Sequence, residues 1–232
     1  MEGPPVAVAL MAKAPRAGAV KTRLCPPLMP REAAALARAF LRDAIAKVRL
    51  LQGVAPAVAY APESAREAFA RLAPGFALMP QRGTDLGARM RSTLAALLAA
   101  GHRAAVVMGT DTPTLPAAVL AEAVTRVAAE DVDLVVGPAE DGGYYLIGAR
   151  ADHPTLFDDV AWSTGAVLAT TLRRAAQAGL RSARLPAWFD VDTPDDLARL
   201  RAALAQTPDA APATNRFLKR SEACRRRAPA RR

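Results

Sequence analysis

Residues 104–113 read Ala-Ala-Val-Val-Met-Gly-Thr-Asp-Thr-Pro, a short apolar run followed by a polar turn. The run does not alternate between apolar and polar side chains, which is typical of a parallel strand buried on both faces of a sheet. Gly109 and Pro113 end the strand and place Asp111 in its exit loop. The run from Val6 to Met11 has the same character. Together the two runs predict the centre of a parallel sheet.

The rest of the chain alternates between short strand-like runs and longer helical stretches. Strands separated by helices favour a mainly parallel sheet covered on both faces, that is, a three-layer α/β/α domain. In such sheets ligands bind beyond the carboxyl ends of the strands. Besides the two runs above, we expect strands at 55–60, 76–79, 133–136, 144–148 and 180–185, and helices at 30–51, 62–72, 85–100, 116–129, 163–178 and 194–204.

Charge divides the chain into a body and a tail. Residues 1–205 suit one α/β domain and carry a net charge of +3, whereas residues 206–232 hold eight Lys or Arg and two acids, a net charge of +6. Proline and small residues open the tail, so we expect it to be disordered. Its single aromatic residue, Phe217, offers little for base stacking, and we expect no nucleic-acid partner. The alternative is a basic-tail binder of nucleic acid or an acidic membrane surface, without turnover.

The apolar pattern contains no expected membrane span. No apolar run reaches the roughly 20 residues that cross a bilayer, and the N-terminal residues lack the basic start of a signal peptide. Cys25 and Cys224 are far apart and neither has a C-x-x-C neighbour, which argues against a disulfide framework or a metal cluster built on cysteine. We therefore expect a cytoplasmic protein with no transmembrane segment. The pattern makes no prediction about the oligomeric state.

The loop after the first strand concentrates positive charge. Residues 11–24 read MAKAPRAGAVKTRL, with four cations in eleven residues and Gly18 at a turn. Cations and free backbone N–H groups at a strand end suit a polyphosphate, whereas a solvated basic loop is the simpler alternative. Neither the G-x-x-x-x-G-K-[ST] nor the G-x-G-x-x-G pattern is present. The candidate phosphate ligands are Lys13, Gly18, Lys21, Thr22 and Arg23.

Asp111 leaves a buried strand at the edge where ligands are expected. Mg²⁺ and Mn²⁺ prefer carboxylate oxygens and keep waters and substrate phosphates as further ligands, so one or two protein carboxylates suffice. Asp111 is therefore a candidate metal ligand. The alternative is an acid that only shapes the turn or caps the next helix.

Two acids and two glycines follow the fifth expected strand. Residues 140–145 read Glu-Asp-Gly-Gly-Tyr-Tyr. Glycine lets a backbone approach a ligand closely, and an acid here can act as a general base on an acceptor. We take Glu140 and Asp141 as candidate catalytic acids, and Gly142, Gly143 and Tyr144 as candidate acceptor or sugar contacts. A glycine-rich hairpin with solvated acids is the alternative.

Two further segments offer polar groups. Asp190 and Asp192 alternate along an extended segment and so point in the same direction, which makes either one a candidate second metal ligand. The polar loop at 81–89 enters a helix, and it either contacts a nucleotide or only caps that helix. Its candidate nucleotide contacts are Gln81, Gly83, Gly87 and Arg89.

Five segments taken in order resemble the glycosyltransferase-A, or nucleotide-diphosphosugar transferase, superfamily. More narrowly, the chain resembles the bacterial arsenosugar-biosynthesis (selenodomain-associated) glycosyltransferases. The first segment is also similar to that of 2-phospholactate guanylyltransferases, which share Lys-Thr-Arg-Leu. The resemblance spans about residues 5–204, and the segments that carry it are KAPRAGAVKTRL (13–24), QRGTDLGARM (81–90), GTDTPTL (109–115), DGGYYLIG (141–148) and DVDTP (190–194).

The resemblance implies one Rossmann-like domain of the GT-A type, with the nucleotide at the amino-terminal half of the sheet. It implies that Asp111 holds Mg²⁺ or Mn²⁺ with Asp192, or less favourably Asp190, as second ligand. Lys13, Lys21 and Arg23 would neutralise the phosphates. Two departures stand out: the usual Asp-x-Asp is Gly-Thr-Asp here, and the pyrophosphorylase signature G-x-G-x-R is missing.

The leading hypothesis is a metal-dependent transferase that uses a nucleotide-activated donor, a glycosyltransferase acting on a nucleotide sugar and a small-molecule acceptor. The metal would offset charge on the leaving diphosphate, Lys21 would add to that stabilisation, and Asp141 or Glu140 would deprotonate the acceptor. The alternative is a nucleotidyltransferase that joins an NTP to a phosphorylated small molecule and releases pyrophosphate.

Overall fold

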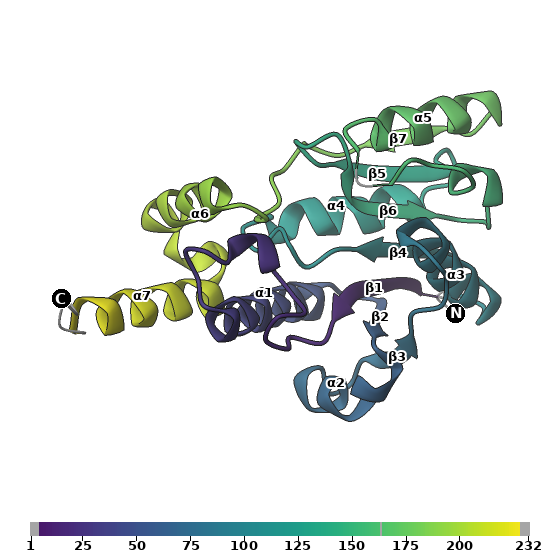
Figure 1. Ribbon diagram of the computed structural model, residues 1–232. Coiled ribbons are helices and arrows are strands. Elements are labelled where there is room, and N and C mark those ends of the chain that lie inside the picture. The colour runs from purple at the N-terminus through teal and green to yellow at the C-terminus, as the bar shows by residue number, and fades with distance from the viewer. Residues whose placement is uncertain (1–4, 163, 228–232) are drawn as a thin grey trace.

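The computed structural model describes residues 5–162 and 164–227, and for residues 222 and 224–227 it describes the backbone alone. Its centre is one seven-stranded sheet in the order β3-β2-β1-β4-β6-β5-β7 (Figure 1). Only β6 runs antiparallel to its neighbours β4 and β5, so the prediction of a mainly parallel sheet is confirmed. The strands are β1 (Val6–Lys13), β2 (Val54–Ala61), β3 (Ala77–Pro80), β4 (Ala104–Met108), β5 (Leu134–Pro138), β6 (Tyr144–Ala149) and β7 (Ser182–Arg184).

The two uninterrupted apolar runs lie side by side at the centre of the sheet. β1 pairs in parallel with β4, from Val6 opposite Ala104 to Leu10 opposite Met108. Valine and leucine side chains of β1 point to one face and the alanines Ala7 and Ala9 to the other. Both faces are buried, which explains why these strands carry no polar alternation.

Helices cover both faces of the sheet. Helices α1, α2 and α4 pack on the face that carries the larger β1 side chains, and α3 and α5 pack on the other face. Helix α6 packs against the outer side of α1. The helices are α1 (Pro30–Leu50), α2 (Arg66–Leu72), α3 (Leu86–Ala99), α4 (Ala117–Ala128), α5 (Val167–Gln177), α6 (Pro194–Gln206) and α7 (Pro212–Arg227).

Local signals set several helix starts. Asp85 accepts a hydrogen bond from the Ala88 N–H and begins α3, and Thr193 accepts one from Asp196 and begins α6. These caps agree with the helix starts expected from the sequence. Helix α5 begins at Val167 instead of at 163 or 164, because Thr164 uses its hydroxyl in a turn to the Ala161 carbonyl. No helix in the described part of the chain is both long and apolar enough for a membrane crossing.

The chain after α6 forms a helix, so the expectation of a disordered tail from residue 206 is wrong up to residue 227. Helix α7 lies beside α1 (Figure 1), with Ala211 and Leu218 buried in the same cluster as Leu36. Asp43 of α1 accepts hydrogen bonds from the Ala213 N–H at 2.8 Å and from the Thr214 N–H at 2.9 Å. Asp43, 170 residues away in sequence, thus caps the start of α7 and stabilises a helix that the local composition does not predict. The expectation for residues 228–232 lies outside the described residues.

The order of the strands reverses between β1 and β4. From β1 the chain continues to β2 and β3 on one side, and the later strands lie beyond β4 on the other side. Such a switch point leaves a crevice at the carboxyl ends of the two strands, because the following loops diverge. The exit loops of β1 and β4 carry the basic segment and Asp111, so both meet at this crevice.

Candidate functional site

A cleft of about 860 Å³ opens at the carboxyl ends of β1 and β4. All five segments that carried the sequence hypothesis contribute to its walls. The predicted site residues that line it are Lys13, Lys21, Thr22, Arg23, Gln81, Arg89, Asp111, Asp141, Gly143, Tyr144 and Asp192. Gly18, Gly83, Gly87, Glu140 and Gly142 are not among its lining residues. The structure therefore brings together the charged part of the prediction, and most of the glycines have other neighbours.

At the base of the cleft one ammonium group joins two carboxylates. Lys21 Nζ lies 2.7 Å from Asp111 Oδ1 and 2.8 Å from Asp192 Oδ1, and it also donates to the Val191 carbonyl at 2.8 Å. A lysine has three N–H donors, and these three acceptors use them all. The expectation that Lys21 contacts a phosphate is therefore not met in this arrangement. Lys21 instead holds the two candidate metal ligands together.

Backbone contacts fix this unit in place. Lys21 has a left-handed conformation, with φ 49°, and the short 3-10 turn Thr22–Leu24 follows it, with Leu24 fully buried. The Val191 N–H donates to the Asp111 carbonyl at 2.9 Å, so the segment before α6 is bonded to the exit loop of β4. Non-glycine residues with positive φ are uncommon and persist where their surroundings hold them. Lys21 is held by its three acceptors and by the Phe40 ring, whose centre is 5.5 Å from Nζ.

The charges are unequally exposed. The Lys21 side chain is 6% exposed, whereas Asp111 and Asp192 are 45% and 43% exposed. Burial alone would lower the pKa of the Lys21 ammonium, but Asp111 and Asp192 outweigh burial and hold that pKa above its usual value. Lys21 therefore stays charged at neutral pH, and each carboxylate keeps an exposed side toward the cleft.

Asp190 is a third half-buried acid of the group. Burial raises the pKa of its carboxyl to about 7, and the neighbouring carboxylates of Asp111, Asp141 and Asp192 act in the same direction. Asp190 and Asp192 both line the cleft, in agreement with the expectation that they point in one direction. With this pKa, Asp190 is only partly ionised at neutral pH, and a protonated carboxyl is a poorer cation ligand than a carboxylate.

The donor set fits a hard divalent cation. Asp111 and Asp192 already share one positive charge, and carboxylate oxygens are the ligands that Mg²⁺ and Mn²⁺ prefer. Among the described residues no group of three or more His, Cys, Asp or Glu side chains is placed to hold a metal ion. A cation held by Asp111 and Asp192 thus depends on a substrate for its remaining ligands, as Mg²⁺ does in nucleotide sites.

The remaining cations stand free at the rim. Lys13 and Arg23 are exposed, line the cleft and have no ion-pair partner among the described residues. Gln81 donates to the Ala59 carbonyl at 2.8 Å, and Arg89 donates to the Gly83 carbonyl at 3.1 Å. Lys13 and Arg23 are therefore available to a phosphate, and Arg89 keeps its terminal guanidinium N–H groups, because its hydrogen bond to Gly83 uses Nε alone. Gln81 already serves the local backbone.

Gly83, Gly87 and Gly142 are required by protein contacts, which corrects the expectation that they admit a ligand. A Cβ at Gly83 would lie 2.7 Å from Ala88, and a Cβ at Gly87 would lie 2.0 Å from Cζ2 of Trp162. At Gly142 a Cβ would lie 2.2 Å from the Gly165 carbonyl oxygen. Gly18 has φ 77° and no neighbour within 4 Å of a Cβ, so only its backbone conformation requires glycine.

The two candidate bases, Glu140 and Asp141, have different surroundings. Glu140 forms two hydrogen bonds with the Arg199 guanidinium of α6, and these bonds lower the pKa of its carboxyl. It is not among the lining residues, so the expectation that Glu140 acts on an acceptor is corrected. Asp141 does line the cleft, and its Oδ1 accepts from the Gly143 N–H at 2.9 Å. Gly143 and Tyr144 also line the cleft, and their contact with an acceptor or sugar stays a prediction.

Sequence reasoning missed Trp162, Thr164 and Gly165, which also line the cleft. They lie between β6 and α5, where the sequence predicted only a helix start. Two features of the sequence could have pointed to this segment: it holds one of the two tryptophans of the chain, and the small residues that follow lack helical periodicity.

Comparison with known proteins identifies relatives of this architecture. A family model described as "Uncharacterized protein conserved in bacteria (DUF2064)" matches residues 44–164. A structure described as a "putative nucleotide-diphospho-sugar transferase" from Desulfovibrio desulfuricans G20 is 32% identical, with TM-score 0.87, over 94% of this chain and 95% of that one. No curated protein sequence matches.

More distant structures share the fold alone. A CMP:2-keto-3-deoxy-manno-octonic acid synthetase complexed with CTP has TM-score 0.56 and 14% identity, over 88% of this chain and 99% of that one. A cytidylyltransferase from Leptospira borgpetersenii serovar Hardjo-bovis (strain JB197) has TM-score 0.56 and 11% identity, over 98% of both chains. The 32% identical structure, which matches 94% of this chain, confirms the resemblance to the nucleotide-diphosphosugar transferase superfamily.

Proposed function

We propose that this chain, which belongs to the bacterial DUF2064 family, is a metal-dependent transferase that uses a nucleotide-activated donor, in the first place a nucleotide sugar. One observation carries the proposal. Asp111 and Asp192 share a single positive charge at the base of a cleft whose rim carries the free cations Lys13 and Arg23. Cations above and carboxylates below are the arrangement that a metal-bound diphosphate requires.

Each residue then has a defined part. Asp111 and Asp192 would hold Mg²⁺ or Mn²⁺, which when bound supplies charge stabilisation to the leaving diphosphate. Lys13 and Arg23 would bind the diphosphate oxygens from the rim. Lys21 keeps Asp111 and Asp192 oriented, and so acts as a positioning residue. Asp141 lines the cleft as the candidate base for an acceptor hydroxyl.

The second candidate is nucleotidyl transfer. The exit loop of β4 reads Gly109-Thr110-Asp111, with one carboxylate where glycosyltransferases of this type have Asp-x-Asp. In that reaction an acceptor phosphate attacks the α-phosphate of an NTP, and Lys13 and Arg23 bind the departing pyrophosphate. The two reactions differ in the bond that is broken, so their products distinguish them.

The test is product analysis with purified protein, Mn²⁺, and matched panels of nucleotide sugars and NTPs with alcohol or phosphorylated acceptors. Release of a nucleoside diphosphate from a nucleotide sugar supports glycosyl transfer. Release of pyrophosphate from an NTP supports nucleotidyl transfer instead and rules out the leading proposal. If no nucleotide of either panel binds or is consumed with Mn²⁺, the proposed function is wrong.

A further inference from the structure

Trp162 lines the cleft and comes from a segment that the sequence motifs did not include. Its indole ring packs directly on Gly87 at the start of α3, in the space that any larger side chain would fill. The Phe157 ring stacks on it at 6.5 Å between centres, and the Tyr144 ring meets it edge-on at 6.4 Å. Trp162 therefore sits in a defined aromatic group whose ring geometry is favourable.

Gly142 fixes the same part of the chain from the other side. The backbone of Gly165 lies against Gly142, and the Leu168 N–H at the start of α5 donates to the Gly142 carbonyl at 2.9 Å. Two motif glycines, Gly87 in the first turn of α3 and Gly142 in the turn before β6, thus leave room for Trp162 and Gly165. Ser163, between them, lies outside the described residues. The Trp162 ring is held before any ligand arrives, which reduces the entropy cost of a contact with it.

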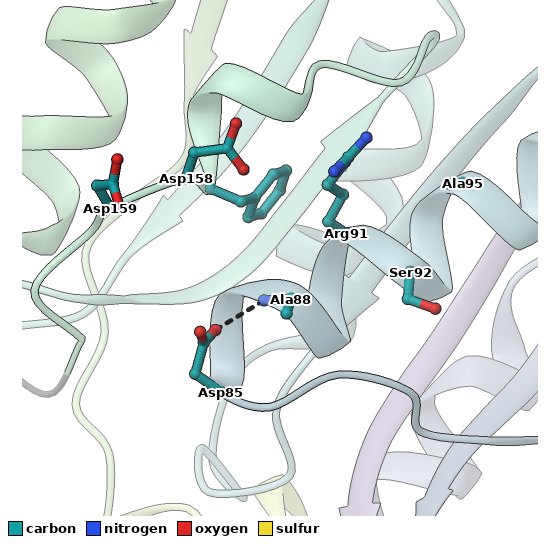
Figure 2. A pocket seen from close by; sticks show the side chains of 8 residues that line it. Asp85, Ala88, Arg91, Ser92, Ala95, Asp158 and Asp159 are labelled. Carbon is teal, nitrogen blue, oxygen red and sulfur yellow. Dashed lines mark hydrogen bonds between the residues drawn. The ribbon is translucent and has the colours of Figure 1, made fainter.

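Phe157 also separates two hollows. It lines a second hollow of about 670 Å³ (Figure 2), whose other walls are the first turns of α3 and the pair Asp158 and Asp159. Arg91 in this hollow is ion-paired with Asp152, and Asp85 caps the Ala88 N–H. Because Trp162 lines the main cleft and Phe157 the second hollow, the stacked pair forms the partition between them.

Uncharged residues line the cleft near Trp162, and the neighbouring segments add the charged residues Asp85, Arg89 and Asp141. Tyr144, Thr164, Gly165 and Val167 line the cleft here. Burial raises the pKa of the Tyr144 hydroxyl, so this side chain stays neutral at physiological pH. The charged groups that suit a diphosphate are Lys13 and Arg23, which the segment at 13–24 supplies. An uncharged ring with an apolar face, such as a sugar, is the chemistry that matches the aromatic wall.

We propose that Trp162, seated on Gly87 and edge-on to Tyr144, is the specificity contact for the transferred group of the donor, and that it selects an uncharged ring. This inference rests on the proposed function, since it names the part of the donor that lies beyond the diphosphate. Gly87 is then a positioning residue for Trp162, because the absence of its Cβ sets where the indole lies.

The test compares intact donors with their own nucleotides. UDP-glucose, GDP-mannose and dTDP-glucose are each titrated against UDP, GDP and dTDP in the full chain with Mn²⁺, by calorimetry. For the donor that the native protein binds, Trp162→Ala should weaken binding about tenfold, whereas the matching nucleoside diphosphate should bind within about twofold of the native protein. Trp162→Phe keeps an aromatic face and should recover most of the donor affinity.

Gly87→Ala supplies the second variant. In the native background it should weaken donor binding but not nucleoside diphosphate binding, because its methyl group displaces the indole. In the Trp162→Ala background it should not weaken donor binding further. Alanine is otherwise favoured over glycine in a helix, so Gly87→Ala with Trp162→Ala should fold at least as stably as Trp162→Ala alone.

Three results would overturn the inference. Equal losses for donor and nucleotide would place Trp162 against the base, and unchanged donor binding in Trp162→Ala would remove it from the site. Additive effects of Gly87→Ala and Trp162→Ala on donor affinity would remove the positioning role of Gly87. In each case nucleotide binding by the native protein persists, so the proposed function stands. If no nucleotide binds the native protein, both fail together.

Discussion

At what we call the charged end of the site, Lys21, Asp111 and Asp192 meet as three charges from distant segments. At the aromatic end, Gly87 and Gly142, which do not line the cleft themselves, leave room for Trp162 and Gly165, which do. The charged end is held by ion pairs and one backbone hydrogen bond, and the aromatic end by close packing. Charged groups stabilise a reacting diphosphate, and a packed wall selects shape. The comparison therefore assigns chemistry to the first end and specificity to the second.

The largest effect should come from Asp111→Asn. Loss of this carboxylate removes one of the two proposed metal ligands, so we expect kcat/KM to fall at least about a hundredfold. The measurement is steady-state turnover of the donor identified by product analysis. Asp195→Asn is the matched control, because Asp195 is exposed in the first turn of α6, and it should change the rate less than about twofold. A fully active Asp111→Asn would place the chemistry elsewhere.

Lys21→Met should lower the free energy of unfolding by about 3 kcal/mol, because it leaves Asp111 and Asp192 adjacent without their shared cation. Urea unfolding followed by circular dichroism measures the change. Lys13→Met removes an exposed lysine of the same loop and should stay within about 0.5 kcal/mol of the native protein. Mn²⁺ should restore part of the loss in Lys21→Met only. A native-like stability of Lys21→Met without metal would show that this end does not depend on its ion pairs.

Asp190 makes the charged end sensitive to pH. The pKa of its carboxyl is raised to about 7 in the folded chain, from an ordinary value near 4. Between these two pH values the folded state holds a proton that the unfolded state has lost. The stabilisation is complete below about pH 4 and is lost as the pH rises through about 7, a fall of roughly 2 to 4 kcal/mol. Unfolding in EDTA between pH 4.5 and 8 measures it.

The control for this titration is Asp190→Asn, which keeps the size of the side chain and cannot ionise. Its unfolding free energy should lack this component of the pH dependence and should exceed that of the native protein at pH 8. A parallel pH profile for the two proteins would show that the pKa of Asp190 is not raised in the folded chain.

The aromatic end is tested by two glycines with similar backbone conformations. Gly142 has φ 88° and Gly18 has φ 77°, but only Gly142 has a neighbour in the space of a Cβ. Gly18→Ala should cost about 1 kcal/mol for the left-handed backbone alone. Gly142→Ala should cost about 2 kcal/mol more, because Gly165 must move. Equal costs for the two, measured by chemical unfolding, would mean that close packing does not hold this end.

The charged end was largely predictable and the aromatic end was not. Uninterrupted apolar runs identified β1 and β4, and the rule that ligands bind at strand ends then predicted that Lys13 and Asp111 lie at one edge of the sheet. Asp192 was added by its alternation with Asp190 and by the family resemblance. A glycine in a motif indicates that another group approaches the backbone closely, but it does not distinguish a ligand from a protein side chain or backbone. Gly87 and Gly142 were therefore read as ligand contacts, although Trp162 and Gly165 are what approaches them.

The same limit applies to partners that are distant in sequence. No local pattern shows that the three acceptors of Lys21 lie some 90 and 170 residues away, or that Asp43 caps α7. The Pro and Arg content of the last segment predicted a disordered basic tail. Composition carries no information about α1, the helix against which this segment packs. Local propensity is a weak guide wherever tertiary contacts decide.

The most direct measurement of the central claim is calorimetric titration of nucleoside diphosphates into the native protein and into Asp111→Asn, each with and without Mn²⁺. The account predicts that at least one nucleoside diphosphate binds the native protein in a Mn²⁺-dependent manner, and that Asp111→Asn loses at least about tenfold in affinity. Binding that is indifferent to both Mn²⁺ and Asp111, or no binding at all, would contradict it.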